Sequence, residues 1–228
     1  DLFVKSGCEV VIYPTQSYHD AYKKVKRYEE DYDIVVCSGG DGTLDEVVTG
    51  MMKRGGKTPV GYIPTGTTND FANSLHIPKD LSAADAAVNG KPFHCDIGQF
   101  NDDYFVYVAA FGLFTDVSYQ TKQEMKNMLG HLAYVMEGAK RLFDIPSYHV
   151  RVEYDGNDIE DDFVFCSVTN SRSMGGFRNM FGHEVEFDDG EFEVTLVRSP
   201  KNLLEMQSIV TSLMSKEKNS DYIYNIKA

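Results

Sequence analysis

Apolar and polar positions in the first third of the chain alternate between strand patterns and helix patterns. The apolar runs Asp33–Cys37 and Val60–Ile63 predict strands that are buried on both faces, and Glu9–Tyr13 predicts another strand. Three helices are predicted between and after them: Tyr18–Glu30 with Ser17 as N-cap, Leu44–Lys53 ending at Gly55-Gly56, and Asp70–Leu75. Strands that alternate with helices predict an open parallel sheet with right-handed crossovers.

From Phe93 onward, the pattern changes to strands with alternating polar and apolar residues. The predicted strands are Tyr104–Ala109, His149–Tyr154, Phe163–Thr169 and Glu191–Val197, with a helix at Lys122–Phe143 and a hairpin turn at Asp155-Gly156-Asn157. We therefore predict an α/β domain at residues 1–91, followed by an antiparallel β-sandwich-like domain at residues 92–228. The boundary is expected near Asn89–Pro92.

The charge of the chain limits the partners that it can bind. A formal net charge of −13 over 228 residues disfavours nucleic acid, because most of the surface would repel phosphates. The densest acidic run, Glu153–Asp162, is interpreted as a solvated hairpin. No run of about 18 apolar residues predicts a spanning helix, and the first residues, Asp1–Lys5, do not resemble a signal peptide.

The cysteines and histidines give no sign of a metal centre. No two of the four cysteines form a CxxC pair, and the histidines show no HxxH or HExxH spacing, so zinc has little support. Cys37 and Cys166 lie in apolar runs that predict strands. We expect them to be buried, reduced thiols of a cytosolic protein.

The loop Gly39-Gly40-Asp41-Gly42-Thr43 follows a predicted buried strand and opens a predicted helix. This arrangement places backbone N–H groups and a helix N-terminus around an anion, and glycine lets the backbone approach a phosphate closely. Asp41 would repel a bare phosphate, but it would suit a divalent cation that is shared with the phosphates. The alternative is a tight turn in which Asp41 is an N-cap.

A second loop, Pro64–Ala72, also follows a predicted buried strand. In a parallel sheet both loops lie at the carboxyl ends of their strands, where open α/β sheets bind ligands. The hydroxyls of Thr67 and Thr68, the amide of Asn69 and the carboxylate of Asp70 are expected on one rim. The alternative is the start of a helix with no further role.

These two loops resemble known signatures. The first is similar to the GGDGT motif that diacylglycerol, sphingosine and ceramide kinases share with NAD kinases and phosphofructokinases. The second resembles the P-x-G-T-x-N-D-F-A segment of the bacterial soluble diacylglycerol kinases, which is more specific, so an NAD kinase fits less well. The resemblance continues through Leu75–Pro78, Asp96–Gly98, Val117–Tyr119, Glu153–Asn157, Thr169–Ser171, Gly175–Phe177 and Asp188–Gly190.

The resemblance implies an ATP- and magnesium-dependent lipid kinase. It places ATP contacts at Thr15, Gly39, Gly40, Asp41, Gly42, Thr43, Leu44, Asp45, Glu46, Gly66, Thr67 and Asn69. Asp41 and Asp70 would position the catalytic magnesium through water. A structural magnesium would be bound by Asp189 with the backbone carbonyls of Glu186 and Glu191, although a plain β-turn also explains Asp188–Glu191.

Two departures from the family pattern matter. Asp45 stands where the family usually has Asn, which changes a possible nucleotide contact. The family's opening N-P-x-x-G segment and its late Asp-Gly-Glu motif have no match, so the general base is expected beyond Ala228 and the sequence is expected to be a fragment. Loss of a general base typically costs a factor of about 10²–10⁴ in rate.

The predicted reaction is transfer of the ATP γ-phosphoryl group to a lipid hydroxyl, with diacylglycerol as the first substrate to test. Another lipid alcohol, such as a sphingoid base or undecaprenol, and a non-catalytic nucleotide- or lipid-binding regulator are the alternatives. We expect a cytoplasmic protein that contacts the inner membrane face peripherally, with Lys53, Arg54 and Lys57 as a candidate basic contact. A homodimer is left open.

Overall fold

The computed structural model describes residues 2–28, 31–113, 115, 145–174, 177–178, 185–215 and 220–228. The chain forms two compact units, Asp1–Tyr107 and Val108–Ala228. The helix that was predicted at Lys122–Phe143 lies outside the described residues. No helix in the described part of the chain is long and apolar enough to span a membrane.

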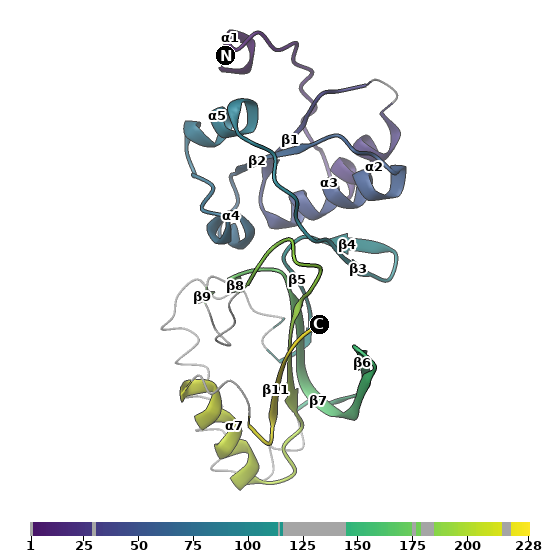
Figure 1. Cartoon of the computed structure of the whole chain (residues 1–228), viewed down its shortest axis with the longest axis vertical. Coiled ribbons are helices and arrows are strands. Elements are labelled where there is room, and N and C mark those ends of the chain that lie inside the picture. Colours follow the sequence, from purple (N-terminus) through teal and green to yellow (C-terminus); the bar gives the residue numbers. More distant parts are fainter. Residues whose placement is uncertain are drawn as a thin grey trace. The chain divides into compact units, whose positions relative to one another are not determined.

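The first unit is an α/β unit built around a parallel strand pair (Figure 1). Its elements are α1 (Leu2–Lys5), α2 (Asp20–Arg27), β1 (Val35–Gly39), α3 (Asp41–Arg54), β2 (Val60–Pro64), α4 (Asp70–Ser74), α5 (Leu81–Asn89), β3 (Gly98–Phe100) and β4 (Asp103–Phe105). The parallel pairing of β1 with β2 confirms the predicted parallel arrangement.

Helices pack on both faces of this strand pair. Tyr62 pairs with Cys37 across the strands, and both lie in the buried cluster to which α3 contributes Leu44 and Val47. Gly61 points to the opposite face, because neighbouring strand residues alternate. A Cβ at Gly61 would lie 2.9 Å from the Cβ of Ala87, so a glycine lets α5 pack closely against β2.

Several of the predicted helices and strands of this unit have different limits, and one does not form. The predicted strand Glu9–Tyr13 is an exposed segment without a strand partner in the described residues, because its apolar pattern alone does not supply a hydrogen-bonding neighbour. Helix α2 begins at Asp20, with His19 and not Ser17 as its N-cap residue. Helix α3 begins at Asp41, three residues earlier than predicted, and ends as predicted at Gly55, which adopts φ 68°.

The structure places the boundary between Tyr107 and Val108, whereas the sequence pattern placed it near Asn89–Pro92. The predicted strand Tyr104–Ala109 is two strands, β4 and β5, which belong to different units. Val106 is 2% exposed within the core of the first unit, and the Thr49 hydroxyl donates to the Tyr104 carbonyl at 3.1 Å. These contacts with α3 keep the segment in the first unit.

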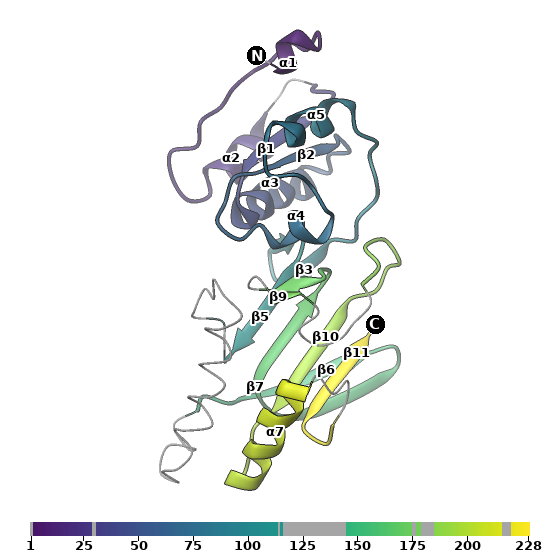
Figure 2. The same ribbon diagram turned by 90° about the vertical axis from the view of Figure 1, so that its left-hand side faces the viewer.

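The second unit is built on an antiparallel sheet (Figure 2). Its elements are β5 (Val108–Gly112), β6 (Tyr148–Tyr154), β7 (Asn157–Thr169), β8 (Ser173–Met174), β9 (Phe177–Arg178), β10 (Glu193–Arg198), α7 (Leu203–Ser215) and β11 (Ile223–Lys227). The main sheet has the order β11-β10-β7-β5, and β6 also pairs with β7. The predicted antiparallel, β-rich second region is therefore confirmed.

Both faces of the main sheet are covered. Helix α7 places Ile209 in a buried cluster with Phe165, Val197 and Ile223 on one face. The β6–β7 hairpin packs Val152 and other apolar side chains against a second cluster that includes Leu196. The layered, sandwich-like character thus comes from a hairpin and a helix on either side of one sheet.

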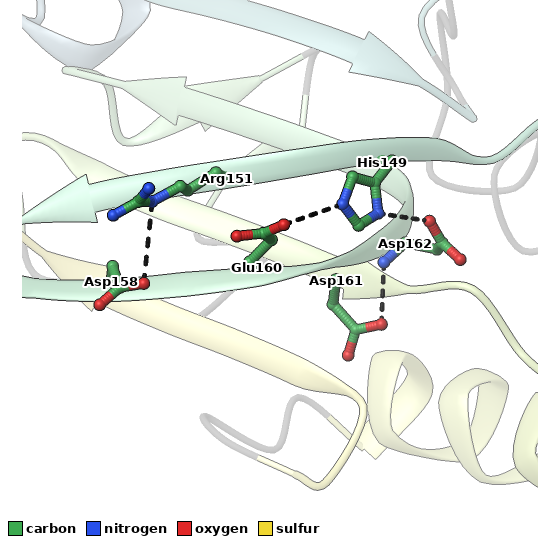
Figure 3. Close-up of polar contacts among 6 residues, drawn as sticks. All are labelled: His149, Arg151, Asp158, Glu160, Asp161 and Asp162. Atoms are coloured by element: carbon green, nitrogen blue, oxygen red, sulfur yellow. Dashed lines mark hydrogen bonds and ion pairs between the residues drawn. The ribbon is translucent and has the colours of Figure 1, made fainter.

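The β6–β7 hairpin also carries the acidic run. Its two-residue turn is Asp155-Gly156, with φ angles of 44° and 78°, as the sequence predicted for a hairpin. His149 lies between Asp162 and Glu160, at 3.0 and 3.1 Å, and both contacts are exposed (Figure 3). The two carboxylates raise the pKa of His149. The interpretation as a solvated hairpin is confirmed.

All four cysteines are free, and Cys37 and Cys166 are buried as predicted. Burial raises the pKa of Cys37 to about 12 and that of Cys166 to about 11. Both side chains therefore remain protonated thiols at neutral pH and act as small apolar groups in the two cores.

Candidate functional site

The two predicted loops lie side by side at the carboxyl ends of β1 and β2. The Thr65 N–H donates to the Gly39 carbonyl at 2.8 Å, so the strand ladder continues into the loops. A Cβ at Gly66 would lie 2.5 Å from the Cα of Gly40, which means that only glycine allows this backbone approach. Gly39 is also crowded, since a Cβ there would lie 2.6 Å from the Thr43 Cβ.

Asp41 joins the two loops through its carboxylate. Its Oδ2 accepts the Asp70 N–H at 2.8 Å, and its Oδ1 accepts the Phe71 N–H at 3.3 Å. These donors are the first N–H groups of α4, a helix whose own N-cap residue, Asn69, makes no side-chain cap. The Asp41 side chain thus caps a helix, as the alternative interpretation proposed. The helix that it caps is α4, which follows the second loop, and not α3, to which Asp41 itself belongs.

Asn69 closes the second loop on itself. Its backbone adopts φ 52°, its Oδ1 accepts the Gly66 N–H at 3.0 Å, and its Nδ2 donates to the Gly66 carbonyl at 2.6 Å. The residue is only 2% exposed. In this structure the amide that was predicted to contact nucleotide shapes the loop.

Three other predicted ATP-contacting residues have side chains that hold the unit together. Leu44 is a core residue that is 3% exposed. Glu46 accepts the His19 N–H at 2.9 Å and satisfies a donor at the start of α2. Asp45 accepts the Val106 N–H at 3.0 Å, a bond that the oxygen of an asparagine could also accept. This contact therefore does not distinguish an aspartate from an asparagine at position 45.

The remaining predicted contacts lie closer to solvent. Thr67 and Gly42 are exposed on the two loops, and Thr43 is half-buried against Gly39. Thr15 is exposed in the irregular segment before α2. The structure therefore brings together the two glycine loops, Asp41 and Asn69, and it leaves Thr67 accessible beside them.

The electrostatics of this site are dominated by buried carboxylates. Burial raises the pKa of Asp41, although the N–H groups of Asp70 and Phe71 oppose that shift. Burial raises the pKa of Asp45 to about 7, with a smaller contribution from Asp41. The pKa of Tyr107 is also raised, by burial and then by Asp41, Asp70 and Asp45. A concentration of negative charge of this kind favours a divalent cation.

The donor set fits the magnesium ion that the resemblance implies. Magnesium prefers carboxylate and water oxygens and usually binds through one or two carboxylates plus phosphate. Asp41 and Asp70 offer two carboxylates at adjoining loop ends, and Asp70 is 1% exposed. No cluster of three or more His, Cys, Asp or Glu side chains suited to a metal occurs among the described residues. The carboxylates of Asp41 and Asp70 therefore suit a magnesium ion whose other ligands are water and phosphate.

The proposed second magnesium site fits less well. Asp189 Oδ2 lies 2.6 Å from Lys227 Nζ, and its Oδ1 accepts the Glu191 N–H at 3.1 Å. The same ammonium lies 3.5 Å from the Glu191 carboxylate. Lys227 lowers the pKa of Asp189. A resident positive charge thus already neutralises the carboxylate that the metal would need.

Sequence reasoning missed Tyr62. This residue is 7% exposed in β2, and its hydroxyl lies 3.4 Å from Asn69 Oδ1 and 3.5 Å from Asp41 Oδ1. The available signal was a tyrosine inside an apolar strand that leads to a candidate loop. A buried phenol hydroxyl requires a polar partner, and the adjacent loop supplies it.

The chain was compared with known proteins. The model of the diacylglycerol kinase catalytic domain family matches residues 1–100. The chain is 38% identical to a diacylglycerol kinase of Staphylococcus carnosus (strain TM300) over 91% of its own length and 68% of that protein. It is 37% identical to a diacylglycerol kinase of Staphylococcus aureus (strain JH9) over 91% of its length and 66% of that protein.

The comparison with solved structures agrees. A crystal structure of a candidate diacylglycerol kinase from Bacillus anthracis str. Sterne superposes with a TM-score of 0.67 at 27% identity. The match covers 94% of this chain and 71% of that one. The chain thus spans about two thirds of the length of these relatives, and the similarity extends over both units.

Proposed function

This chain belongs to the bacterial diacylglycerol kinase family, and we propose from that premise that it is part of a kinase that transfers the γ-phosphoryl group of ATP to a diacylglycerol hydroxyl. The staphylococcal proteins that resemble it carry the name diacylglycerol kinase. For this chain we add that ATP is the phosphoryl donor, magnesium the metal and diacylglycerol the substrate.

The observation that carries the proposal is the position of Asp41. Its carboxylate lies where two glycine-containing loops meet at the ends of parallel strands, beside the buried Asp70. Such a strand end is a site for phosphate groups, because backbone N–H groups are presented without side chains in between. The adjacent carboxylates suit the cation that accompanies a nucleotide.

In the proposed complex, each group has a separate task. The backbone of Gly39–Thr43 and the hydroxyl of Thr67 would orient the phosphates. Asp41 and Asp70 would hold magnesium through their oxygens or through bound water. When bound, that ion would neutralise the charge that develops on the transferred phosphoryl group. Asp45 and Glu46 would act indirectly, by fixing α3 to Val106 and His19.

No step is assigned to a second magnesium at Asp189. The ammonium of Lys227 already satisfies that carboxylate at 2.6 Å. The resemblance implies that the backbone carbonyls of Glu186 and Glu191 are further ligands of that ion, and no other role is proposed for these two residues.

The proposal includes a peripheral membrane contact, because a diacylglycerol substrate resides in the bilayer. The basic residues that were considered for it are partly engaged within the first unit. Arg54 stacks on the Tyr28 ring at 3.6 Å and donates to the Tyr28 carbonyl. Lys53 lies 5.8 Å from the centre of the Tyr104 ring. Among the described residues no such contact gives Lys57 another role, so Lys57 remains the candidate.

A phosphoryl-transfer assay with the full-length protein tests the proposal directly. Purified protein is incubated with γ-labelled ATP, magnesium and diacylglycerol in mixed micelles, in parallel with a sphingoid base and undecaprenol. Labelled phosphatidic acid as the main product supports the proposal. Label on another lipid would mean that this lipid, and not diacylglycerol, is the substrate. Magnesium-dependent nucleotide binding without any transfer indicates a regulator, and absence of nucleotide binding contradicts the whole proposal.

A further inference from the structure

We infer that Tyr62 is a positioning residue of the nucleotide site, and that its hydroxyl fixes the Asp41 carboxylate and the Asn69 side chain relative to each other. The inference rests on the proposed function, because it gives Tyr62 a task in binding the magnesium–nucleotide complex.

The position of Tyr62 separates its ring from its hydroxyl. The ring belongs to the core cluster of the first unit, opposite Cys37 in the strand register and packed with residues of α3. The hydroxyl extends from that core to the point where both loops begin. A phenylalanine would fill the same space in the core but would bring no polar atom to the loops.

The hydroxyl meets one acceptor from each loop. Asp41 Oδ1 at 3.5 Å belongs to the residue that follows β1, and Asn69 Oδ1 at 3.4 Å belongs to the loop that follows β2. A tyrosine has one proton to donate, and the two acceptors are almost equally distant from its oxygen, so either acceptor can receive it. The two acceptors are therefore held at a common centre, and any separation of the loops weakens at least one contact.

Each acceptor already has a backbone donor. Asp41 Oδ1 accepts the Phe71 N–H, and Asn69 Oδ1 accepts the Gly66 N–H. Tyr62 adds a side-chain donor to both sets and connects them into one network, in which α4, both loops and β2 share hydrogen bonds. Networks of this kind rigidify a site when their members are satisfied.

The charge of the phenol defines what Tyr62 can do. Burial and the nearby Asp41 raise its pKa far above the usual value for tyrosine, so the hydroxyl stays protonated and acts as a donor. As a donor it contacts the Asp41 carboxylate of the first loop and the Asn69 side chain of the second.

The test is the substitution Tyr62→Phe in the full-length protein. We expect the concentrations of magnesium and of ATP that give half-maximal activity to rise about 2- to 10-fold, the range that corresponds to one hydrogen bond. The Michaelis constant for the lipid should not change.

Tyr28→Phe is the matched control. Its hydroxyl lies in the same unit, near Met51 Sδ at 3.6 Å and Thr58 Oγ1 at 3.5 Å, and its ring packs against the same core cluster. Loss of that hydroxyl should leave the magnesium and ATP dependences as in the wild type. A purely structural effect of removing a tyrosine hydroxyl would lower the melting temperature in both variants without moving these dependences.

A binding measurement separates failure of this inference from failure of the proposed function. The shift in melting temperature caused by magnesium and a non-hydrolysable ATP analogue is measured for wild type and Tyr62→Phe. A smaller shift for the variant at equal ligand concentration supports the inference. An equal shift, with unchanged half-maximal concentrations of magnesium and ATP, overturns it while the kinase proposal stands. No shift in the wild type refutes both.

Discussion

The two units bury acidic side chains in different ways. In the first unit, Asp41, Asp45 and Glu46 each accept at least one backbone N–H from another part of the chain. In the second unit, Glu193 is 1% exposed, and neither carboxylate oxygen has a hydrogen-bond partner in another described residue. The comparison teaches that burial alone does not identify the role of an acid. Partners distinguish carboxylates that shape a site from a carboxylate whose burial is not offset by hydrogen bonds.

The largest effect is expected where the two loops of the first unit touch. Gly66→Ala places a Cβ 2.5 Å from Gly40 Cα and 2.7 Å from Asn69 Oδ1, so the loops must separate. We expect a loss of about 1–3 kcal/mol of stability and about 100-fold weaker catalysis, as for a misplaced site. Thermal melts and kinase assays measure both.

Gly42→Ala controls for the loss of a glycine itself. A Cβ at Gly42 has nothing within 4 Å, and the residue lies in the first turn of α3. The melting temperature of the Gly42→Ala variant should equal or exceed that of the wild type, because alanine favours a helix more than glycine does. Similar melting temperatures for the two variants would contradict the close packing at Gly66.

Asp41→Asn tests the partnered carboxylates. The amide keeps one acceptor oxygen but removes the charge and one of the two caps on α4. We expect kcat to fall by a factor of about 10² or more and stability to fall by about 1 kcal/mol. Asp85→Asn, which removes an exposed carboxylate on α5, should change neither quantity. Retained activity in Asp41→Asn would exclude a role for this charge.

Glu193→Gln tests the unpartnered carboxylate. Burial raises the pKa of Glu193 from 4.5 to about 7, so the folded state holds the proton more tightly than the unfolded state does. Stability conferred by the protonated form is therefore lost as the pH rises from about 4.5 to about 7. The variant, which stays neutral, should flatten this part of the stability–pH curve measured by urea unfolding.

Asp45→Asn sharpens the same comparison, because the pKa of Asp45 is also raised to about 7 but its Oδ1 has a partner in Val106. Above pH 7 both substitutions should raise stability, and the gain for Asp45→Asn should be at least as large as that for Glu193→Gln, because the pKa of Asp45 rises from 3.8 to about 7 even with the Val106 N–H in place. A smaller gain for Asp45→Asn would mean that the backbone partner offsets more of the burial of the Asp45 charge than these pKa shifts indicate.

The smallest effect is expected at the exposed ion pair of the second unit. Lys227→Met removes the cation that lowers the pKa of Asp189, so stability present above the ordinary aspartate pKa should decrease slightly at low salt. The difference in melting temperature should vanish at high salt. Magnesium without nucleotide should not stabilise the wild type through this site; a magnesium effect that requires Asp189 would show that the ion displaces Lys227.

Much of the architecture could be predicted from local patterns. The apolar runs around Cys37 and Tyr62 predicted the paired strands, and Asp155-Gly156 predicted the hairpin, because these signals depend on neighbouring residues only. The run Glu9–Tyr13 was mispredicted since a strand also needs a partner, which its own sequence does not specify. The boundary between the units lies later in the sequence than predicted, because the Val106 N–H donates to Asp45, a residue of α3 that lies 61 positions earlier.

The candidate site was predictable in position but not in detail. The loop motifs indicated where Asp41 and Asn69 lie, because strand ends of a parallel sheet meet at one edge. They did not indicate that Asp41 caps α4 or that Asn69 folds back onto Gly66. Those contacts depend on how two loops from separate strands fit together, which residue spacing does not encode. Tyr62 was missed for the same reason.

The contact between Gly40 and Gly66 also has an evolutionary consequence. Because a Cβ at Gly66 would lie 2.5 Å from the Gly40 Cα, and a Cβ at Gly40 would lie 3.3 Å from the Gly66 Cα, a side chain at either position presses on the other loop. A substitution or a change of length in one loop requires a compensating change in the other. The two motifs, which are 26 residues apart in the sequence, should therefore be inherited together as a single unit of variation.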